Sequence, residues 1–145
     1  MGSPCQVDFY VLAPSAPSAG HLACRLSLRA WEQGHRISVL AASEDDARRL
    51  DELMWDFPPG RFLPHELGPA DARVPVVIVY PPNPPPADRD VVVNLTSEAV
   101  ADPGSFKRLL EIVPAEPQLR ESSRSKFRAY RGLGLEPRHH DIQTF

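Results

Sequence analysis

The 145-residue sequence predicts a single α/β domain, residues 1–145, with a mostly parallel central sheet that is flanked by helices. Short runs of β-branched and aromatic residues alternate along the chain with longer segments whose apolar residues recur at helical spacing. Strands and helices that alternate in this way are joined by crossover connections, so the strands lie parallel in one sheet. The length is that of one domain with a substantial core.

The first predicted unit is a strand, a helix and a second strand. Residues 7–12, VDFYVL, form the strand because β-branched and aromatic side chains favour an extended chain. A helix with a broad apolar stripe then begins at about Ser18, and Gly34 ends it. Residues 37–42, ISVLAA, form the second strand.

A second helix is predicted from its N-cap, Ser43, to about Trp55. Acidic residues fill its first turn, where the helix dipole favours negative charge. The Pro-rich segment that follows, residues 56–75, breaks the alternation and is predicted to be a loop. It carries Phe57 and Phe62 close to Trp55, and aromatic residues in irregular chain need burial by the body of the protein or by a partner.

The next part of the chain predicts two more strands and a short helix. Residues 76–80, VVIVY, and residues 91–95, VVVNL, are almost continuously apolar, as in strands that are covered on both faces. The Pro-rich residues 81–86 between them are predicted to form a stiff loop, and a ligand for a proline-binding module is the alternative. Residues 105–113, SFKRLLEIV, have the spacing of a short amphipathic helix, which Pro114 ends.

The last predicted helix, residues 119–133, holds the clearest concentration of positive charge. Arg124, Phe127, Arg128 and Arg131 fall within about a third of the helix circumference. Arginine presents a planar, charged fork to carboxylate or phosphate, and the aromatic ring beside it offers an apolar surface. The pattern indicates a ligand that is acidic and partly apolar. The alternative is that the arginines only form a solvated face near the helix C-terminus.

A neighbouring face of this last helix is expected to pack on the core, because Leu119, Tyr130 and Leu133 cluster there. Gly134 follows at a position where helices commonly end. The final residues, 137–145, PRHHDIQTF, are expected to form a polar tail.

Charge and cysteine content limit the class of protein. The formal net charge of -3 argues against a general nucleic-acid binder, so any basic site is local. Cys5 and Cys24 form no CxxC and are too few for a secreted disulfide framework. The N-terminal residues do not resemble a signal peptide, and no segment approaches the roughly 18 apolar residues of a membrane span, so the expected location is the cytoplasm.

The sequence lacks the common motifs for catalysis and cofactor binding. It contains neither GxxxxGKS, GxxxxGKT nor GxGxxG, and no GxSxG marks an exposed nucleophile. Adjacent His139 and His140 would not share a helix face, and lone His65 carries no specific signal. The sequence therefore predicts neither an enzyme nor a cofactor or metal site. It predicts a fold that resembles a nucleotide-binding domain without the phosphate loop.

Several segments, taken in order over nearly the whole chain, resemble the chi subunit of bacterial DNA polymerase III. They are FYVL, WEQGHRISVLA, RLDELMWDFPPGRFLPHEL, VVVNL, FKRLLEIVP and RSKFRAYRGLG. The most specific are the acidic helix ending in RLDELMW with FLPH a few residues later, and EIVP followed by RSKFRAY.

The resemblance implies a non-catalytic accessory subunit of the clamp-loader complex, located with the replisome in the cytoplasm. Chi proteins link the polymerase holoenzyme to single-stranded DNA-binding protein, whose acidic C-terminal tail ends in a Pro-Phe carboxylate. In many bacteria they pair with the psi subunit. Contact with DNA would be only indirect, and the family's fold, a mostly parallel sheet flanked by helices, agrees with the one predicted above.

The resemblance also implies two sets of site residues. The positions that match the family's groove for the acidic tail are Val113, Arg124, Phe127 and Arg128. Val113 would supply an apolar wall from the preceding helix. Trp55 and Phe62 match positions that face psi, or a helicase partner that competes for the same surface, and core packing of Trp55 is the alternative. The alternative function is a direct single-stranded DNA-binding module that uses the same basic helix.

Overall fold

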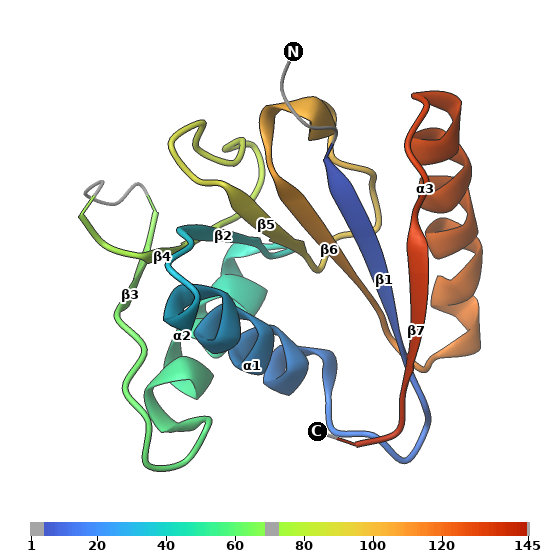
Figure 1. The fold of residues 1–145 in the computed structure, drawn as a ribbon. Helices are drawn as coiled ribbons and strands as arrows, with labels where there is room; N and C mark the ends of the chain where they lie inside the picture. Colours follow the sequence, from blue (N-terminus) through green and yellow to red (C-terminus); the bar gives the residue numbers. More distant parts are fainter. Residues whose placement is uncertain (1–4, 69–72, 145) are drawn as a thin grey trace.

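The computed structural model describes residues 5–68 and 73–144, which form one seven-stranded sheet with helices on both faces (Figure 1). The strand order is β3-β4-β2-β5-β6-β1-β7, and every neighbouring pair is parallel. The strands are β1 (Gln6–Leu12), β2 (Ile37–Leu40), β3 (His65–Leu67), β4 (Val76–Val79), β5 (Val91–Asn94), β6 (Arg108–Val113) and β7 (Arg138–Ile142). The predicted α/β class is confirmed, and the sheet is parallel throughout.

The helices begin where the sequence predicts them. They are α1 (Ala19–Glu32), α2 (Glu44–Asp56) and α3 (Arg120–Gly132), with short 3-10 helices η1 (Pro103–Ser105) and η2 (Pro117–Leu119). The Ser18 hydroxyl accepts a hydrogen bond from the backbone N–H of His21 at 3.3 Å, and Ser43 accepts one from Asp46 at 3.1 Å. Each cap satisfies a first-turn N–H that has no partner within the helix.

The two faces of the sheet carry separate cores. Ile37, Val93 and Ile112 point to the face that α1 and α2 cover, whereas Phe9 and Leu109 point to the face that α3 covers. Figure 1 shows α1 and α2 side by side and α3 apart from them, beside β1 and β7. Because successive side chains of a strand point to opposite faces, strands covered on both faces are apolar almost continuously.

Residues 105–113 do not form the predicted helix, and most of them belong to β6, which lies between β5 and β1. Leu109 and Val113 enter the core under α3, while Leu110 and Ile112 enter the core under α1. Both faces of the strand are therefore buried. A short apolar run of this kind has no period that distinguishes a strand from a helix, which explains the wrong prediction.

The predicted tail and the predicted loop each contain an edge strand. Much of the tail forms β7, which pairs with β1 from Asp8 opposite Arg138 to Leu12 opposite Ile142. The loop at residues 56–75 contributes the three-residue β3, which pairs with β4. An edge strand has a single neighbour, and charged or polar side chains are common on it, so neither segment needs the apolar run by which strands are predicted.

Candidate functional site

A buried polar network sets the orientation of α3 on the sheet. The Lys126 ammonium lies 2.7 Å from the Glu111 carboxylate of β6 and donates to the Thr96 carbonyl oxygen at 2.8 Å. The Tyr130 hydroxyl and the Asn94 amide both donate to the second oxygen of Glu111. The side chains of Lys126 and Glu111 are only 4% and 0% exposed. Buried charges are tolerated when they are paired and hydrogen-bonded in this way.

This network determines which face of α3 is buried. Tyr130 enters the core, as predicted, but Leu119 and Leu133 are 37% and 63% exposed, so the prediction that they pack on the core is wrong. Lys126 takes a buried position because its ammonium reaches Glu111. The face of the helix that carries the arginines is left exposed to solvent.

A hollow of about 160 Å³ lies between α3 and the sheet. Val113 from β6 and Arg124 and Phe127 from α3 line it, so these three residues, which are far apart in sequence, meet at one place. Val113 comes from a strand and not from the helix that the resemblance implied. The other residues of the lining are Phe9, Val11, Arg120, Ser123 and His139.

The hollow combines apolar surface with positive charge. The Phe127 ring packs on the Phe9 ring with centroids 5.3 Å apart, and Val113 beside them is buried. The Arg124 side chain, by contrast, is exposed. A ligand that enters would meet apolar side chains at depth and a guanidinium group near the solvent, which suits an acidic group next to an apolar one.

Arg128 lies one turn along α3 from Arg124 and outside the lining of the hollow. Both arginines form ion pairs with Glu121: Nη1 of Arg124 and Nη2 of Arg128 lie 3.5 Å and 3.3 Å from its carboxylate oxygens. All three side chains are exposed. Exposed ion pairs contribute about 0–1 kcal/mol, so another carboxylate can replace Glu121 at little cost.

The sequence prediction did not include Arg120 or His139, which also line the hollow. Arg120 precedes Arg124 by four residues, so helical spacing is a signal that could have included it. His139 has no such signal. Its position depends on the pairing of β7 with β1, which sets it opposite Phe9.

Trp55 and Phe62 form an exposed aromatic pair beside β3. They are 57% and 62% exposed, and their ring centroids are 5.9 Å apart. The ring of Trp55 also packs on that of His65, with centroids 4.7 Å apart. His65 is buried, and its Nδ1 lies 2.6 Å from the carbonyl oxygen of Leu63. The alternative that Trp55 is a core residue is therefore wrong.

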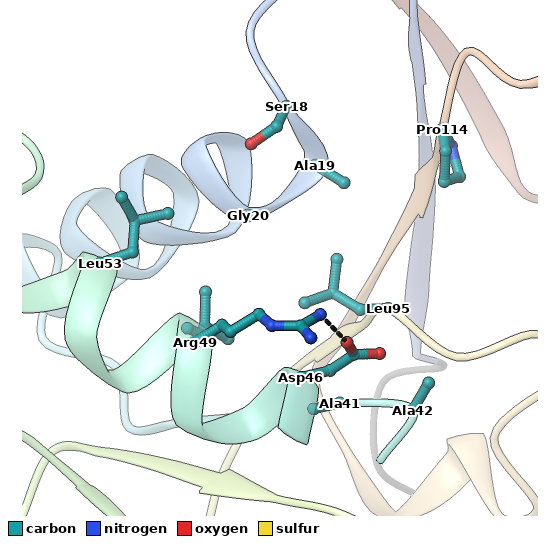
Figure 2. Close-up of a pocket in the computed structure, with 11 residues that line it drawn as sticks. Ser18, Ala19, Gly20, Ala41, Ala42, Asp46, Arg49, Leu53, Leu95 and Pro114 are labelled. Carbon is teal, nitrogen blue, oxygen red and sulfur yellow. Dashed lines mark hydrogen bonds and ion pairs between the residues drawn. The ribbon is translucent and has the colours of Figure 1, made fainter. Parts of the chain in front are cut away.

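A second hollow, of about 320 Å³, lies between the first turn of α1 and the first three turns of α2, at the carboxyl ends of the strands (Figure 2). Open α/β sheets commonly hold ligands in such a crevice. The lining here is mainly apolar. Its two charged residues pair with each other, with Nη1 of Arg49 3.4 Å from Oδ1 of Asp46. Among the described residues that line it, no cation is left unpaired for a phosphate.

The two cysteines are buried thiols. Burial raises the pKa of Cys5 to about 11 and that of Cys24 to about 12. Such thiols react slowly, because the thiolate is the nucleophile. Within residues 5–68 and 73–144, no three His, Cys, Asp or Glu side chains lie together as a metal site would require. None of the helices in the described part of the chain is both long and apolar enough to cross a membrane.

Comparison with known proteins connects the chain with a replication family. Residues 5–138 match the family described as DNA polymerase III chi subunit, HolC. The chain is 40% identical over 138 residues to the DNA polymerase III subunit chi of Pseudomonas aeruginosa, covering 94% of this chain and 96% of that protein. It is 30% identical over 116 residues to the DNA polymerase III subunit chi of Escherichia coli, covering 79% of each.

A solved structure shares the fold at low sequence identity. The crystal structure of T4 UvsW superposes with a TM-score of 0.67 and 7% identity, over 96% of this chain and 42% of that one. At this identity the likeness shows the fold alone.

Proposed function

The chain belongs to the DNA polymerase III chi subunit family, and we propose that it binds the acidic C-terminal tail of single-stranded DNA-binding protein. An accessory role in replication follows from the family. In the proposed function the chain catalyses no reaction. It links the clamp-loader complex to the protein that coats single-stranded DNA, and it contacts DNA only indirectly.

The hollow beside α3 carries this proposal. Its volume is about 160 Å³. A protein cavity of about 150 Å³ holds benzene, so the hollow suits the ring of a terminal phenylalanine. Phe127 and Val113 would contact that ring, while Arg124 and Arg128 would bind the carboxylates of the tail. A tail that ends in Pro-Phe places its ring and its terminal carboxylate on one residue, which matches an apolar hollow beside arginines.

The exposed pair Trp55 and Phe62 supports a second contact. Exposed aromatic side chains are frequent anchors of protein interfaces. We infer that this pair faces the psi subunit, or a helicase partner that competes for the same surface. The pair lies beside β3, at the opposite edge of the sheet from β7. Two partners could therefore bind one chain at the same time.

Isothermal titration with a short acidic peptide that ends in Asp-Ile-Pro-Phe tests the tail site. We expect micromolar binding, and loss of binding when the same peptide lacks its final phenylalanine. Moderate salt should weaken binding without abolishing it, because the contact with the ring is apolar. Equal affinity for the two peptides would contradict a phenylalanine pocket.

Arg124→Ala should lower the peptide affinity by about 1–2 kcal/mol, roughly five- to thirtyfold, because charge-assisted hydrogen bonds from an exposed arginine are lost. Arg48→Ala is the matched control. The Arg48 side chain is 62% exposed and pairs with Glu44 on α2, much as the Arg124 side chain is 68% exposed and pairs with Glu121. Unchanged affinity for Arg124→Ala, or equal losses in the two variants, would remove Arg124 from the site.

Direct binding of single-stranded DNA is the alternative that the basic face of α3 suggests. Proteins of that class usually combine a basic groove with aromatic side chains on which successive bases stack. Here the Phe127 ring is half-buried against Phe9, and the formal net charge is -3. Titration with a labelled oligonucleotide in the absence of other proteins separates the two functions. Tight binding that falls steeply with salt would favour DNA.

A further inference from the structure

β7 places two adjacent histidines on opposite faces of the sheet. His139 lies opposite Phe9 in the register with β1, so its side chain points to the α3 face and lines the hollow. His140 points to the other face. There its ring stacks on that of Tyr10 with centroids 4.9 Å apart, and its Nε2 lies 2.8 Å from Oδ1 of Asp8. Of the two, His139 is therefore the one placed to meet a ligand bound beside α3.

We propose that His139 is a further binding residue of this site, and that its protonated ring contacts a carboxylate of the acidic peptide. This inference rests on the proposed function and extends it, because it makes recognition of the peptide depend on pH. The His139 side chain is 58% exposed, so a ligand can reach it. It shares the lining of the hollow with Arg120 and Arg124, so a carboxylate bound by these arginines comes close to the imidazole ring.

The groups that face His139 come from four elements. The four are α3, β7, β1 and β6. The charged groups are Arg120 and Arg124 from α3, and Asp141 from β7, whose Oδ1 lies 2.9 Å from Nε2 of His139. A protonated imidazole donates from both nitrogens, so it can hold Asp141 with Nε2 and a ligand carboxylate with Nδ1. The uncharged residues of the lining are Phe9, Val11, Val113, Ser123 and Phe127.

The ionisation of these groups sets the direction of the pH dependence. Between about pH 5.5 and pH 7.5, arginine side chains stay charged and the carboxylates of peptides stay ionised. Histidine is the side chain that changes charge in this range. In the proposed site, protonation of His139 as pH falls would add a positive charge to the hollow, and the affinity for the acidic peptide should rise about three- to fivefold, the worth of an exposed ion pair.

Titration of the full chain with an N-acetylated peptide ending in Asp-Ile-Pro-Phe, at about pH 5.5 and about pH 7.5, tests this inference. His139→Gln should bind the peptide with the same affinity at both pH values. His139→Lys, which keeps a positive charge throughout, should bind tightly at both. His140→Gln is the matched control on the other face of β7, and it should keep the pH dependence of the wild type.

The outcomes separate this inference from the proposed function. If His139→Gln keeps the full pH dependence, or if His140→Gln removes it, the inference is wrong, but the peptide still binds and the proposed function stands. If the wild type binds the peptide at neither pH, the proposed function is wrong and the inference falls with it. Loss of the dependence in His139→Gln, together with tight binding by His139→Lys, would assign the effect to the charge.

Discussion

Glu121 shows how a single residue can adjust the charge of the proposed binding site for the acidic tail. Its carboxylate pairs with both Arg124 and Arg128 on the exposed face of α3. These are the guanidinium groups that the proposed ligand would use. Because each pair is exposed, it contributes little to stability and is readily replaced. In the proposed function Glu121 would therefore compete with the ligand carboxylates for the two arginines.

Glu121→Gln should raise the affinity for the acidic peptide about two- to fivefold, because the exposed ion pairs no longer compete with the ligand. Isothermal titration measures the change, and the thermal midpoint should stay close to that of the wild type. Glu52→Gln is the control, since it removes the same charge from an exposed position on α2. A lower affinity in Glu121→Gln would mean that Glu121 orients the arginines instead of competing for the ligand.

At the scale of elements, α3 is held on the sheet through polar as well as apolar contacts. Its buried residues are Ser123, Lys126 and Tyr130. Burial, and then the neighbouring Glu111 carboxylate, raise the pKa of Tyr130, so its hydroxyl stays protonated and continues to donate to Glu111. The same contacts set the rotation of the helix about its axis, and hence place Arg120 and Arg124 at the hollow.

Lys126→Met should lower the free energy of unfolding by about 3–5 kcal/mol, because it leaves the Glu111 carboxylate buried without its cation. The double variant Lys126→Met with Glu111→Gln should recover part of this loss, since it removes the uncompensated charge. Urea unfolding near neutral pH measures both. A cost below about 1 kcal/mol for the single variant, the range of an exposed pair, would contradict the role assigned to the network.

Asp8 joins β7 to β1 and makes this contact sensitive to acid. Burial raises the pKa of the Asp8 carboxyl, but hydrogen bonds from His140 and Arg108 outweigh burial, so the pKa lies below its usual value. A carboxyl whose pKa is lower in the folded protein than in the unfolded chain stabilises the fold at pH values above the unfolded pKa, which is about 3.9 for aspartate. This stabilisation is lost as pH falls from the unfolded pKa through the folded pKa. Asp8→Asn should cost about 1–3 kcal/mol near neutral pH.

The difference in stability between Asp8→Asn and the wild type should shrink as pH falls below about 4, because Asp8 then gains a proton in the unfolded chain first and, below its lowered folded pKa, in the folded protein as well. Urea unfolding at neutral and acid pH measures this change. Asp56→Asn, at an exposed position at the end of α2, controls for the loss of one charge. If the difference were the same at both pH values, the charge of Asp8 would not be its cause.

At the scale of the whole molecule, the two candidate surfaces lie at opposite edges of one sheet. The aromatic pair Trp55 and Phe62 adjoins β3, which forms one edge, while α3 packs on β1 next to β7, which forms the other. A continuous parallel sheet separates them (Figure 1). This arrangement suits an adaptor, because one partner need not displace the other.

The double variant Trp55→Ala with Phe62→Ala should therefore leave the affinity for the acidic peptide within about 0.5 kcal/mol of the wild type, as expected for distant sites with no shared partners. Adding Arg124→Ala to it should cost as much affinity as Arg124→Ala costs alone. Isothermal titration of the double variant, the triple variant and Arg124→Ala with the peptide measures these affinities. A clear loss of peptide affinity in the aromatic double variant would show that the two surfaces are coupled.

Short-range patterns predicted part of the fold and of the candidate site. The caps Ser18 and Ser43 and the apolar strands around them were predicted correctly, because caps and periodicity involve residues within one or two turns. The edge strands β3 and β7 were missed, because a strand at an edge is defined by the neighbour that it pairs with and not by an apolar run. Arg120 could have been included by helical spacing, but His139 could not.

By itself, the sequence determined the α/β class, the capped helices and the basic face of the last helix with Phe127 in it. Only the tertiary structure decided that Val113 comes from a strand, that Lys126 is buried beside Glu111, and that His139 joins the arginines. The physical reason is the range of the interactions. Caps and helical spacing act between near neighbours, whereas strand pairing and a buried ion pair exist only when distant segments have already been brought together.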